Sequence, residues 1–255
     1  MSALAPPRGQ ALADPPPLDP RHAALFADLD GTLAPIEATP DEVGPDRTRR
    51  RLLDALSSVL SGRLAVISGR GLADIDRVLE GRVPAVAAVH GLVRRTTGGR
   101  LLAPPADPRI REATASLRAF ARTDPGLLVE DKSVAVALHF RAAPQAAEDC
   151  RALAVRLAEA RGLVLQEGAM VVELRLPGPD KGAAVRAFMA EAPFAGATPV
   201  FLGDDLTDEA GFAEAGRLGG YGVVVGPRRP TRATYALAGV AAARRWLKRS
   251  IEAAA

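Results

Sequence analysis

The sequence predicts an α/β fold in which a parallel sheet, covered by helices on both faces, is interrupted by an inserted α+β domain. Two observations point to this fold. Short, continuously apolar runs alternate with helical periodicity at both ends of the chain, which is typical of strands buried in a parallel sheet. Between these two parts, proline-rich joints at 103–105 and 177–179 bracket a segment with a different order of elements. The 255 residues suffice for such a core and a second, smaller domain.

The core elements follow from apolar runs, which predict strands, and from apolar residues at helical spacing, which predict helices. Before the insert they are, in order, strand 22–28, helix 48–60, strand 64–67, helix 72–79 and strand 83–89. After the insert they are a helical run behind Lys181, strand 198–202, helix 208–215, strand 221–225 and a closing helix that contains Trp246 and Leu247. This alternation is what a doubly covered parallel sheet requires.

The insert is predicted to contain two helices and four strands. In order they are helix 108–122, strands 127–130 and 133–141, helix 144–160, and strands 163–166 and 170–176. Side chains alternate between the two faces of a strand, so one face of this small sheet is apolar. The other face carries charge, with His139, Arg141, Glu173 and Arg175. We therefore expect a core at 21–105 and 178–255 and an inserted domain at 106–177.

Composition and charge exclude several classes of protein. The net charge is +3 and the basic residues are spread out, so we expect neither a nucleic-acid nor a membrane partner. No apolar stretch approaches the roughly 18 residues that a transmembrane helix needs. The single cysteine, Cys150, falls in a helical pattern and is expected to be an inert thiol in a cytoplasmic monomer. Residues 1–20 hold six prolines and are expected to form a mobile, disordered tail.

Acidic residues follow two of the predicted core strands. The first strand ends in Asp28-Leu-Asp30-Gly-Thr32, and the strand at 198–202 leads into Asp204, Asp205 and Asp208. Ligands bind beyond the carboxyl ends of the strands in open α/β sheets, so these carboxylates are expected to meet at one edge. Carboxylates that close together favour a cation between them, and oxygen ligands suit Mg²⁺. The Gly31–Thr32 turn offers amides and a hydroxyl for a phosphate.

Two further segments favour an anion at the same edge. Ser68-Gly69-Arg70 stands between a strand and a helix and supplies a hydroxyl, free amides and a helix N-terminus. Lys181 lies where the chain re-enters the core. The chain has three lysines, Lys132, Lys181 and Lys248, against thirty arginines, which indicates that a compact ammonium is needed where a lysine stands.

Together these residues predict phosphoryl transfer by positioning and charge neutralisation. A carboxylate such as Asp28 can attack phosphorus once Mg²⁺ and Lys181 neutralise the approaching anions. The neighbouring Asp30 can protonate the leaving alkoxide and then deprotonate the water that clears the aspartyl phosphate.

The motifs Asp28-Leu-Asp-Gly-Thr, Ser68-Gly-Arg, Asp180-Lys-Gly and Gly203-Asp-Asp-Leu-Thr-Asp-Glu, in this order, resemble those of the haloacid dehalogenase-like (HAD-like) phosphatases. The resemblance is closer still to the trehalose-6-phosphate phosphatase family, and it extends from Ala23 to Trp246. It includes an insert similar to that family's sugar-binding cap. The expected fold is then a Rossmann-like, HAD-like core with a cap domain that determines substrate specificity, and the expected reaction is hydrolysis of trehalose 6-phosphate in trehalose biosynthesis.

The resemblance also implies roles for individual residues. Asp28 would be the nucleophile and Asp30 the acid/base, while Asp28, the Asp30 carbonyl and Asp204 hold Mg²⁺ with Asp205 and Asp208 nearby. The expected phosphate ligands are Thr32, Ser68, Gly69 and Lys181. The expected ligands for the rest of the substrate are Arg70 and, in the cap, Glu130, Lys132, Arg141 and Glu173.

One loop departs from the family pattern, and other functions remain open. Val89 precedes His90 where an acid is usual, and Leu92 stands where alanine is expected, which leaves the role of His90 unassigned. The main alternative is a related capped phosphatase that acts on sucrose 6-phosphate or a glycosyl-phosphoglycerate. A non-catalytic sugar-phosphate sensor is the alternative from another class. A signalling receiver domain is disfavoured because its acidic pair comes first in the chain, whereas here it comes last.

Overall fold

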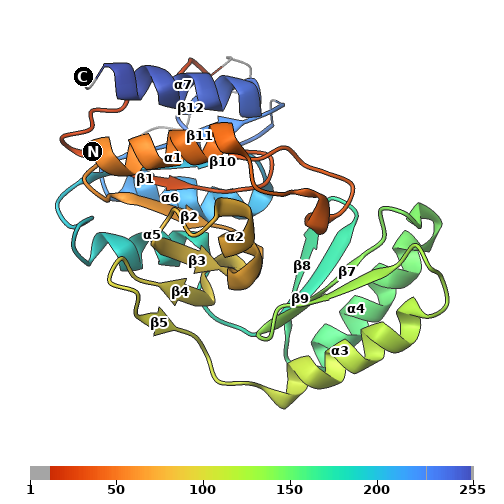
Figure 1. The fold of residues 1–255 in the computed structure, drawn as a ribbon. Helices are drawn as coiled ribbons and strands as arrows, with labels where there is room; N and C mark the ends of the chain where they lie inside the picture. Colours follow the sequence, from red (N-terminus) through yellow and green to blue (C-terminus); the bar gives the residue numbers. More distant parts are fainter. Residues whose placement is uncertain (1–11, 228, 254–255) are drawn as a thin grey trace. The chain divides into compact units, whose positions relative to one another are not determined.

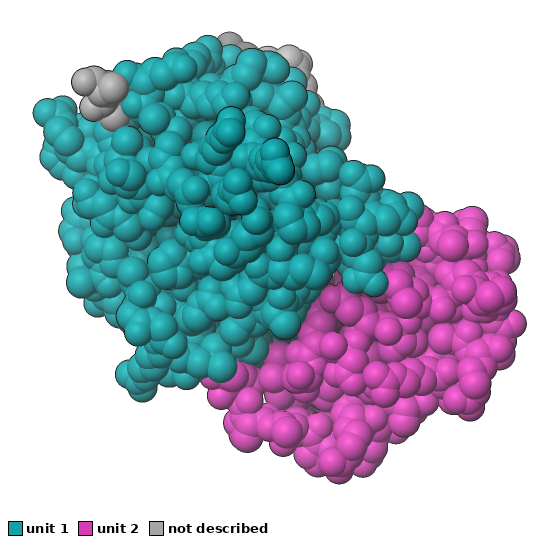
Figure 2. Space-filling model, viewed as in Figure 1, with its two compact units in different colours: residues 1–102, 179–255 teal, residues 103–178 magenta. Residues whose placement is uncertain are grey.

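The structure is a computed structural model, and it describes residues 12–227 and 229–253. The chain divides into two compact units (Figure 2): residues 1–102 with 179–255, called the core unit here, and residues 103–178, called the insert unit. Each unit has its own sheet (Figure 1), of eight strands in the core unit and four in the insert unit.

The sheet of the core unit is parallel over six strands and ends in two antiparallel ones. Its order is β12-β11-β10-β1-β2-β3-β4-β5, and β4 and β5 are the antiparallel pair. The strands are β1 (Ala23–Ala27), β2 (Leu64–Ile67), β3 (Ala85–Ala88), β4 (Val93–Arg95), β5 (Leu101–Leu102), β10 (Thr198–Gly203), β11 (Tyr221–Val225) and β12 (Tyr235–Leu237). Every residue of β1 is buried, as expected for a central strand covered on both faces.

Helices cover both faces of this sheet (Figure 1): α1 packs beside α7, and α5 packs beside α6. The helices of the core unit are α1 (Arg47–Val59), α2 (Leu72–Leu79), α5 (Lys181–Met189), α6 (Glu209–Arg217) and α7 (Val240–Glu252). Short 3-10 turns lie at Pro40–Glu42, Val89–Gly91 and Leu206–Asp208. The predicted α/β class is confirmed by this arrangement.

Aromatic side chains fill the space between β1, β10 and the α5–α6 pair. Phe26 stacks with Phe194, their ring centroids 5.4 Å apart, and Phe201 meets Phe212 edge to face at 5.6 Å. All four are buried, and full burial of such a ring contributes about 1.5–3 kcal/mol. This packing fixes the strands whose ends carry the acidic loops.

The expectation of a disordered tail does not hold for residues 12–20. Leu18 is buried and its N–H donates to the Ser250 hydroxyl (3.0 Å), while the indole N–H of buried Trp246 donates to the Pro16 carbonyl (2.8 Å). The segment is held because α7 supplies an apolar surface and two polar partners. The rest of the predicted tail, residues 1–11, lies outside the described residues.

The insert unit is a four-stranded antiparallel sheet with its helices on one face (Figure 1). The sheet order is β6-β7-β9-β8, and α3 and α4 pack against it. The elements are α3 (Pro108–Ala121), β6 (Leu128–Asp131), β7 (Ala135–His139), a 3-10 turn (Pro144–Ala146), α4 (Ala147–Arg161), β8 (Val164–Gly168) and β9 (Val171–Arg175). Within the part of the chain that the structure describes, no helix combines the length and apolar character needed to cross a membrane.

Candidate active site

The carboxyl ends of three neighbouring strands bring the predicted loops of the core unit together. β1 lies between β10 and β2, and the three strands are parallel, so their last residues reach one edge of the sheet. Asp28 follows β1, Ser68 follows β2 and Asp204 follows β10. The Asp28 N–H donates to the Leu202 carbonyl (2.8 Å), which extends the β1–β10 hydrogen bonding up to the first acid.

Lys181 lies buried between two of the carboxylates. Its Nζ is 3.0 Å from Asp28 Oδ1 and donates to Asp208 Oδ1 at 2.7 Å. The lysine is the first residue of α5, and Asp180 caps that helix by accepting the Ala183 N–H. Gly182 permits the close approach of α5 to α6, because a Cβ there would lie 2.5 Å from the Ala210 carbonyl oxygen.

Three carboxylates form a cluster that fits a cation. One oxygen each from Asp28, Asp204 and Asp208 lies within 4.8 Å of the others. Burial raises the pKa of Asp28, although Lys181 opposes this shift, and burial with the neighbouring Asp208 and Asp205 raises the pKa of Asp204 to about 7. Burial also raises the pKa of Asp208. When all three acids are ionised, their negative charge exceeds the charge of the one ammonium by two, and a divalent cation would balance this excess.

The backbone of the 203–209 loop is organised by its own acids. Asp208 Oδ2 accepts the N–H groups of Asp204 (2.8 Å) and Asp205 (2.9 Å), and Asp205 Oδ1 accepts the Thr207 N–H (2.7 Å). The Asp205 carboxylate therefore caps the turn, and the described cluster of three carboxylates does not include it. Gly31, with a φ of +73°, lets Asp204 approach the first loop, because a Cβ there would lie 2.1 Å from Asp204 Oδ2.

Arg229 holds this loop from outside. Its guanidinium donates to the Asp205 carbonyl at 2.6 Å and more distantly to the Asp204 carbonyl (3.4 Å), and it pairs with Glu209. The sequence gives no sign of this role for Arg229, because one arginine among thirty carries no signal. Its place after β11, at the same edge of the sheet, is the only feature that could have drawn attention to it.

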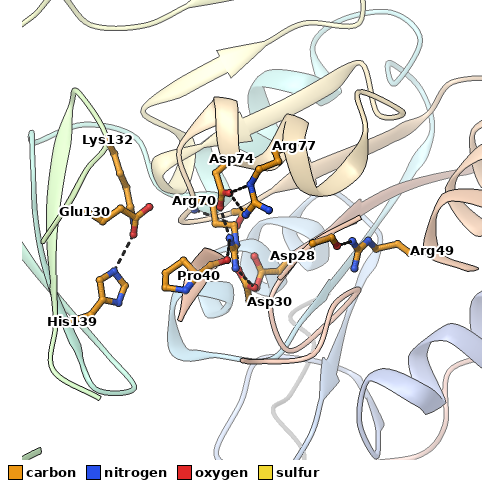
Figure 3. Close-up of polar contacts among 12 residues, drawn as sticks. Asp28, Asp30, Pro40, Arg49, Arg70, Asp74, Arg77, Glu130, Lys132 and His139 are labelled. Atoms are coloured by element: carbon orange, nitrogen blue, oxygen red, sulfur yellow. Dashed lines mark hydrogen bonds and ion pairs between the residues drawn. The ribbon is translucent and has the colours of Figure 1, made fainter. Parts of the chain in front are cut away.

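The Ser68-Gly69-Arg70 loop faces Asp30. Arg70 Nε donates to Asp30 Oδ2 (2.6 Å) and Nη2 to Asp30 Oδ1 (2.8 Å), so both oxygens of that carboxylate are engaged (Figure 3). The Ser68 hydroxyl accepts the Arg70 N–H (3.3 Å), and Thr32 Oγ1 donates to Asp204 Oδ1 (3.3 Å). Gly69 lies against His90, because a Cβ at Gly69 would be 2.6 Å from two atoms of the imidazole ring.

The insert unit carries its charges on the sheet face opposite the helices. The register places Glu130, Ala137, Glu173 and Gln166 in one row across the four strands. Lys132 Nζ lies 2.5 Å from Glu173 Oε2, and His139 Nε2 lies 2.9 Å from Glu130 Oε2 (Figure 3). Glu173 is buried while Arg141 is exposed, and Arg141 donates to the Ala169 carbonyl (3.1 Å) at the turn between β8 and β9.

A profile of the trehalose-phosphatase family matches residues 26–241. The trehalose-6-phosphate phosphatase of Escherichia coli (strain K12) is 41% identical over 241 residues, which cover 94% of this chain and 90% of the E. coli protein. The chain belongs to the trehalose-phosphatase family.

Solved structures agree with this membership of the trehalose-phosphatase family. A crystal structure of a trehalose-6-phosphate phosphatase related protein superposes with a TM-score of 0.77 at 27% identity, covering 90% of this chain and 97% of that one. A sugar phosphatase of HAD subclass IIB superposes with a TM-score of 0.60 at 14% identity, covering 89% of this chain and 98% of that one. The second likeness shows the HAD fold.

The structure brings most of the residues expected from the trehalose-phosphatase family into these two groups. Lys181 contacts Asp28 and Asp208 at the core edge with Asp204 beside them, and Glu130, Lys132 and Glu173 lie together on the insert sheet. Three of the expected side chains also make contacts within the chain: Asp205 caps its own turn, Arg70 binds Asp30, and Arg141 binds a turn carbonyl.

Proposed function

We propose that this chain hydrolyses trehalose 6-phosphate to trehalose and phosphate through a phosphoaspartate on Asp28. The observation that carries the proposal is the buried Asp28–Lys181 contact at the carboxyl end of β1, with two further carboxylates beside it. A lone buried carboxylate beside an ammonium is an ordinary ion pair. An ammonium shared by two acids, with a third carboxylate beside them, in a member of the trehalose-phosphatase family, favours a centre for phosphoryl transfer.

Mg²⁺ is the cofactor that this donor set fits best. The ligands would be oxygens of Asp28 and Asp204 and the Asp30 carbonyl, with Asp208 holding the loop from behind. A hard cation with oxygen ligands suits these groups, and the described residues near them offer no cysteine cluster that would favour zinc. Bound Mg²⁺ would neutralise charge on the phosphoryl group.

The residues of the chain would carry the reaction in two displacements. A carboxylate oxygen of Asp28 bonds to phosphorus as the bond between phosphorus and the sugar oxygen breaks, and the leaving oxygen takes a proton from Asp30. Asp30 then removes a proton from water, whose oxygen attacks the phosphorus and releases Asp28 and inorganic phosphate. Lys181 would balance negative charge throughout, and the Ser68 hydroxyl, the Thr32 loop and the Gly69 amide would bind phosphate oxygens.

The insert unit would act as the cap and recognise the sugar. Glu130, Lys132 and Glu173 present carboxylates and an ammonium on one sheet face, and such groups hydrogen-bond hydroxyls through both donors and acceptors. Arg141, at the end of the same sheet, is proposed to join them on binding. A cytoplasmic location and a monomeric state stay predictions from the sequence.

The experiment that tests this function is phosphate release from trehalose 6-phosphate, with glucose 6-phosphate, sucrose 6-phosphate and glucosyl-3-phosphoglycerate beside it. Each substrate is assayed with Mg²⁺ and with excess EDTA. We expect Mg²⁺-dependent release from trehalose 6-phosphate far above the other three. Mg²⁺-dependent release from one of the other esters, and not from trehalose 6-phosphate, would support the proposed mechanism but assign a different substrate. No metal-dependent release from any of them would favour a sugar-phosphate sensor.

A further inference from the structure

The ion pair between Arg70 and Asp30 has a geometry that substrate binding by Arg70 does not explain. The guanidinium meets the carboxylate side on, with Nε and Nη2 each donating to a different oxygen, at 2.6 and 2.8 Å. This two-point contact fixes the plane of the carboxylate as well as its place, which a single point charge does not do. The two residues are 40 positions apart and come from the loops after β1 and β2.

Arg70 is itself held on its other side. Nη1 donates to the Pro40 carbonyl (2.9 Å) and to Asp74 on the first turn of α2, and Asp74 also accepts from Arg77 at 2.9 Å (Figure 3). Four of the five N–H donors of Arg70 are therefore engaged within the core unit. Its side chain is 7% exposed, whereas that of Asp30 is 32% exposed. The buried arginine is a fixed support, and the carboxylate that it holds reaches solvent.

The backbone of Arg70 also contacts the proposed phosphate loop. Its N–H donates to the Ser68 hydroxyl (3.3 Å), and its carbonyl accepts the Val89 N–H (3.0 Å). One residue thus connects the position of Asp30 with that of Ser68. Because its side chain and backbone already make these hydrogen bonds within the chain, Arg70 is poorly placed to bind a substrate that must enter and leave.

We propose that Arg70 is a positioning residue that sets the orientation of the Asp30 carboxylate for proton transfer, and that it is not a ligand for the substrate. The inference rests on the proposed function. A carboxylate has about four lone-pair directions, and Arg70 occupies two of them, so only two directions remain through which Asp30 can pass a proton to the leaving oxygen. Proton transfer in a transition state depends on such alignment, and misplacement of about 1 Å can cost about a hundredfold in rate.

The test is the dependence of kcat/KM on the leaving group, measured with phenyl phosphate and 2,4-dinitrophenyl phosphate in the presence of Mg²⁺. Under the proposed mechanism, kcat/KM covers the steps up to cleavage of the ester bond, so it reports the proton given to the leaving oxygen and not the later attack of water. Phenolate leaves poorly and needs the proton, whereas dinitrophenolate leaves without it.

Arg70→Lys keeps the charge and removes the two-point contact. We expect it to lower kcat/KM for phenyl phosphate about a hundredfold, the usual contribution of a general acid, and for the dinitrophenyl ester less than about threefold. Asp74→Asn keeps Arg70 but weakens the contact that holds it. This variant should also lower kcat/KM for phenyl phosphate more than for the dinitrophenyl ester, but by a smaller factor. The matched control is Arg82→Ala, which removes an exposed arginine that pairs with Asp54 outside this network, and which should leave the ratio of the two substrates unchanged.

Equal losses on both esters in Arg70→Lys and Asp74→Asn would overturn the inference and assign Arg70 a structural role. A raised KM with unchanged kcat on both esters would also overturn it and restore the expected role in substrate binding. Circular dichroism and thermal melting identify a variant that has not folded, in which case Asp74→Asn alone decides. If the wild type hydrolyses neither ester nor any sugar phosphate, the proposed function and the inference both fail. If it is active and the ratio does not change, only the inference fails.

Discussion

The two charged clusters of the molecule differ in how their charges are balanced. At the edge of the core sheet, Asp28 and Asp208 share the single ammonium of Lys181, Asp204 lies beside them, and all but Asp204 are buried. On the insert sheet, each carboxylate has a nitrogen partner of its own, because Glu173 meets Lys132 and Glu130 meets His139.

This difference indicates what each cluster can bind. Buried like charges raise the pKa of one another, and an added cation relieves their repulsion. Carboxylates that already have partners gain little from a cation but can exchange these hydrogen bonds for those of a polyhydroxylated ligand. The core cluster is therefore suited to a metal and a phosphate, and the insert cluster to a sugar.

Among changes in the core cluster, removal of the proposed nucleophile should cause the largest loss of activity. Asp28→Asn keeps the shape of the side chain but cannot form the phosphoaspartate, so we expect kcat to fall at least about a thousandfold with every substrate. Phosphate release from trehalose 6-phosphate and from an aryl phosphate measures the effect. The control is Asp54→Asn on the exposed side of α1, which should keep full activity. Normal turnover by folded Asp28→Asn protein is incompatible with the mechanism.

A change in the insert cluster should separate the two substrates. Glu173→Gln should lower kcat/KM for trehalose 6-phosphate about 10–100-fold, because remote binding interactions are used in the transition state, and change that for p-nitrophenyl phosphate by less than about threefold. The matched control is Glu167→Gln, on the neighbouring strand but on the opposite face of the sheet, which should alter neither value. If Glu173→Gln lowers kcat/KM equally for both substrates, this face of the insert sheet does not bind the sugar.

The contact of Arg229 with the metal-side loop provides a finer test. Arg229→Ala releases the Asp204 and Asp205 carbonyls, and loss of such outer support typically weakens metal affinity about 10–100-fold. We expect the lower end of this range, measured by calorimetric titration of the protein with Mg²⁺. Arg217→Ala, which removes a surface pair with Glu214, should leave the affinity unchanged. An unchanged affinity in Arg229→Ala would show that Asp208 holds the loop without it.

The smallest effect is expected in the pH dependence of stability without metal. The pKa of Asp204 is raised to about 7, so the folded chain keeps a proton there that the unfolded chain loses near its ordinary value of 3.8. Stability from this group is present at acid pH and is lost as the pH rises towards 7. In EDTA, Asp204→Asn should therefore gain in Tm relative to the wild type by a few degrees between pH 5 and 7.5. A difference in Tm that is constant with pH would contradict this assignment.

Local patterns were enough to predict the central elements. The strands at 64–67 and 221–225 and the helix at 72–79 have the predicted bounds, because each is a run whose burial follows directly from its own residues. β5, of two residues, and β12, of three, are too short to carry a period, and they are strands because a neighbour pairs with them. Residues 12–20 were misjudged for the same reason, since their partner α7 lies more than 200 residues away.

In the candidate site, too, the features set by local sequence could be predicted, and the contacts between distant segments could not. The acids and Lys181 could be placed at one edge because parallel strands order their ends. The pairing within the site could not be predicted: whether Arg70 meets Asp30 or a ligand, and whether Asp205 faces a metal or caps its own turn, depends on side-chain geometry between loops. Arg229 acts through backbone carbonyls, which no sequence motif records.

Trp246 also makes the two units distinguishable by spectroscopy. It is the only tryptophan of the chain, it is buried in the core unit, and residues 103–178 contain neither tryptophan nor tyrosine. Its fluorescence reports the unfolding of the core unit alone, whereas far-ultraviolet circular dichroism reports helices and strands of both. Transitions that coincide would identify one cooperative molecule, and transitions that separate would identify an insert that melts independently.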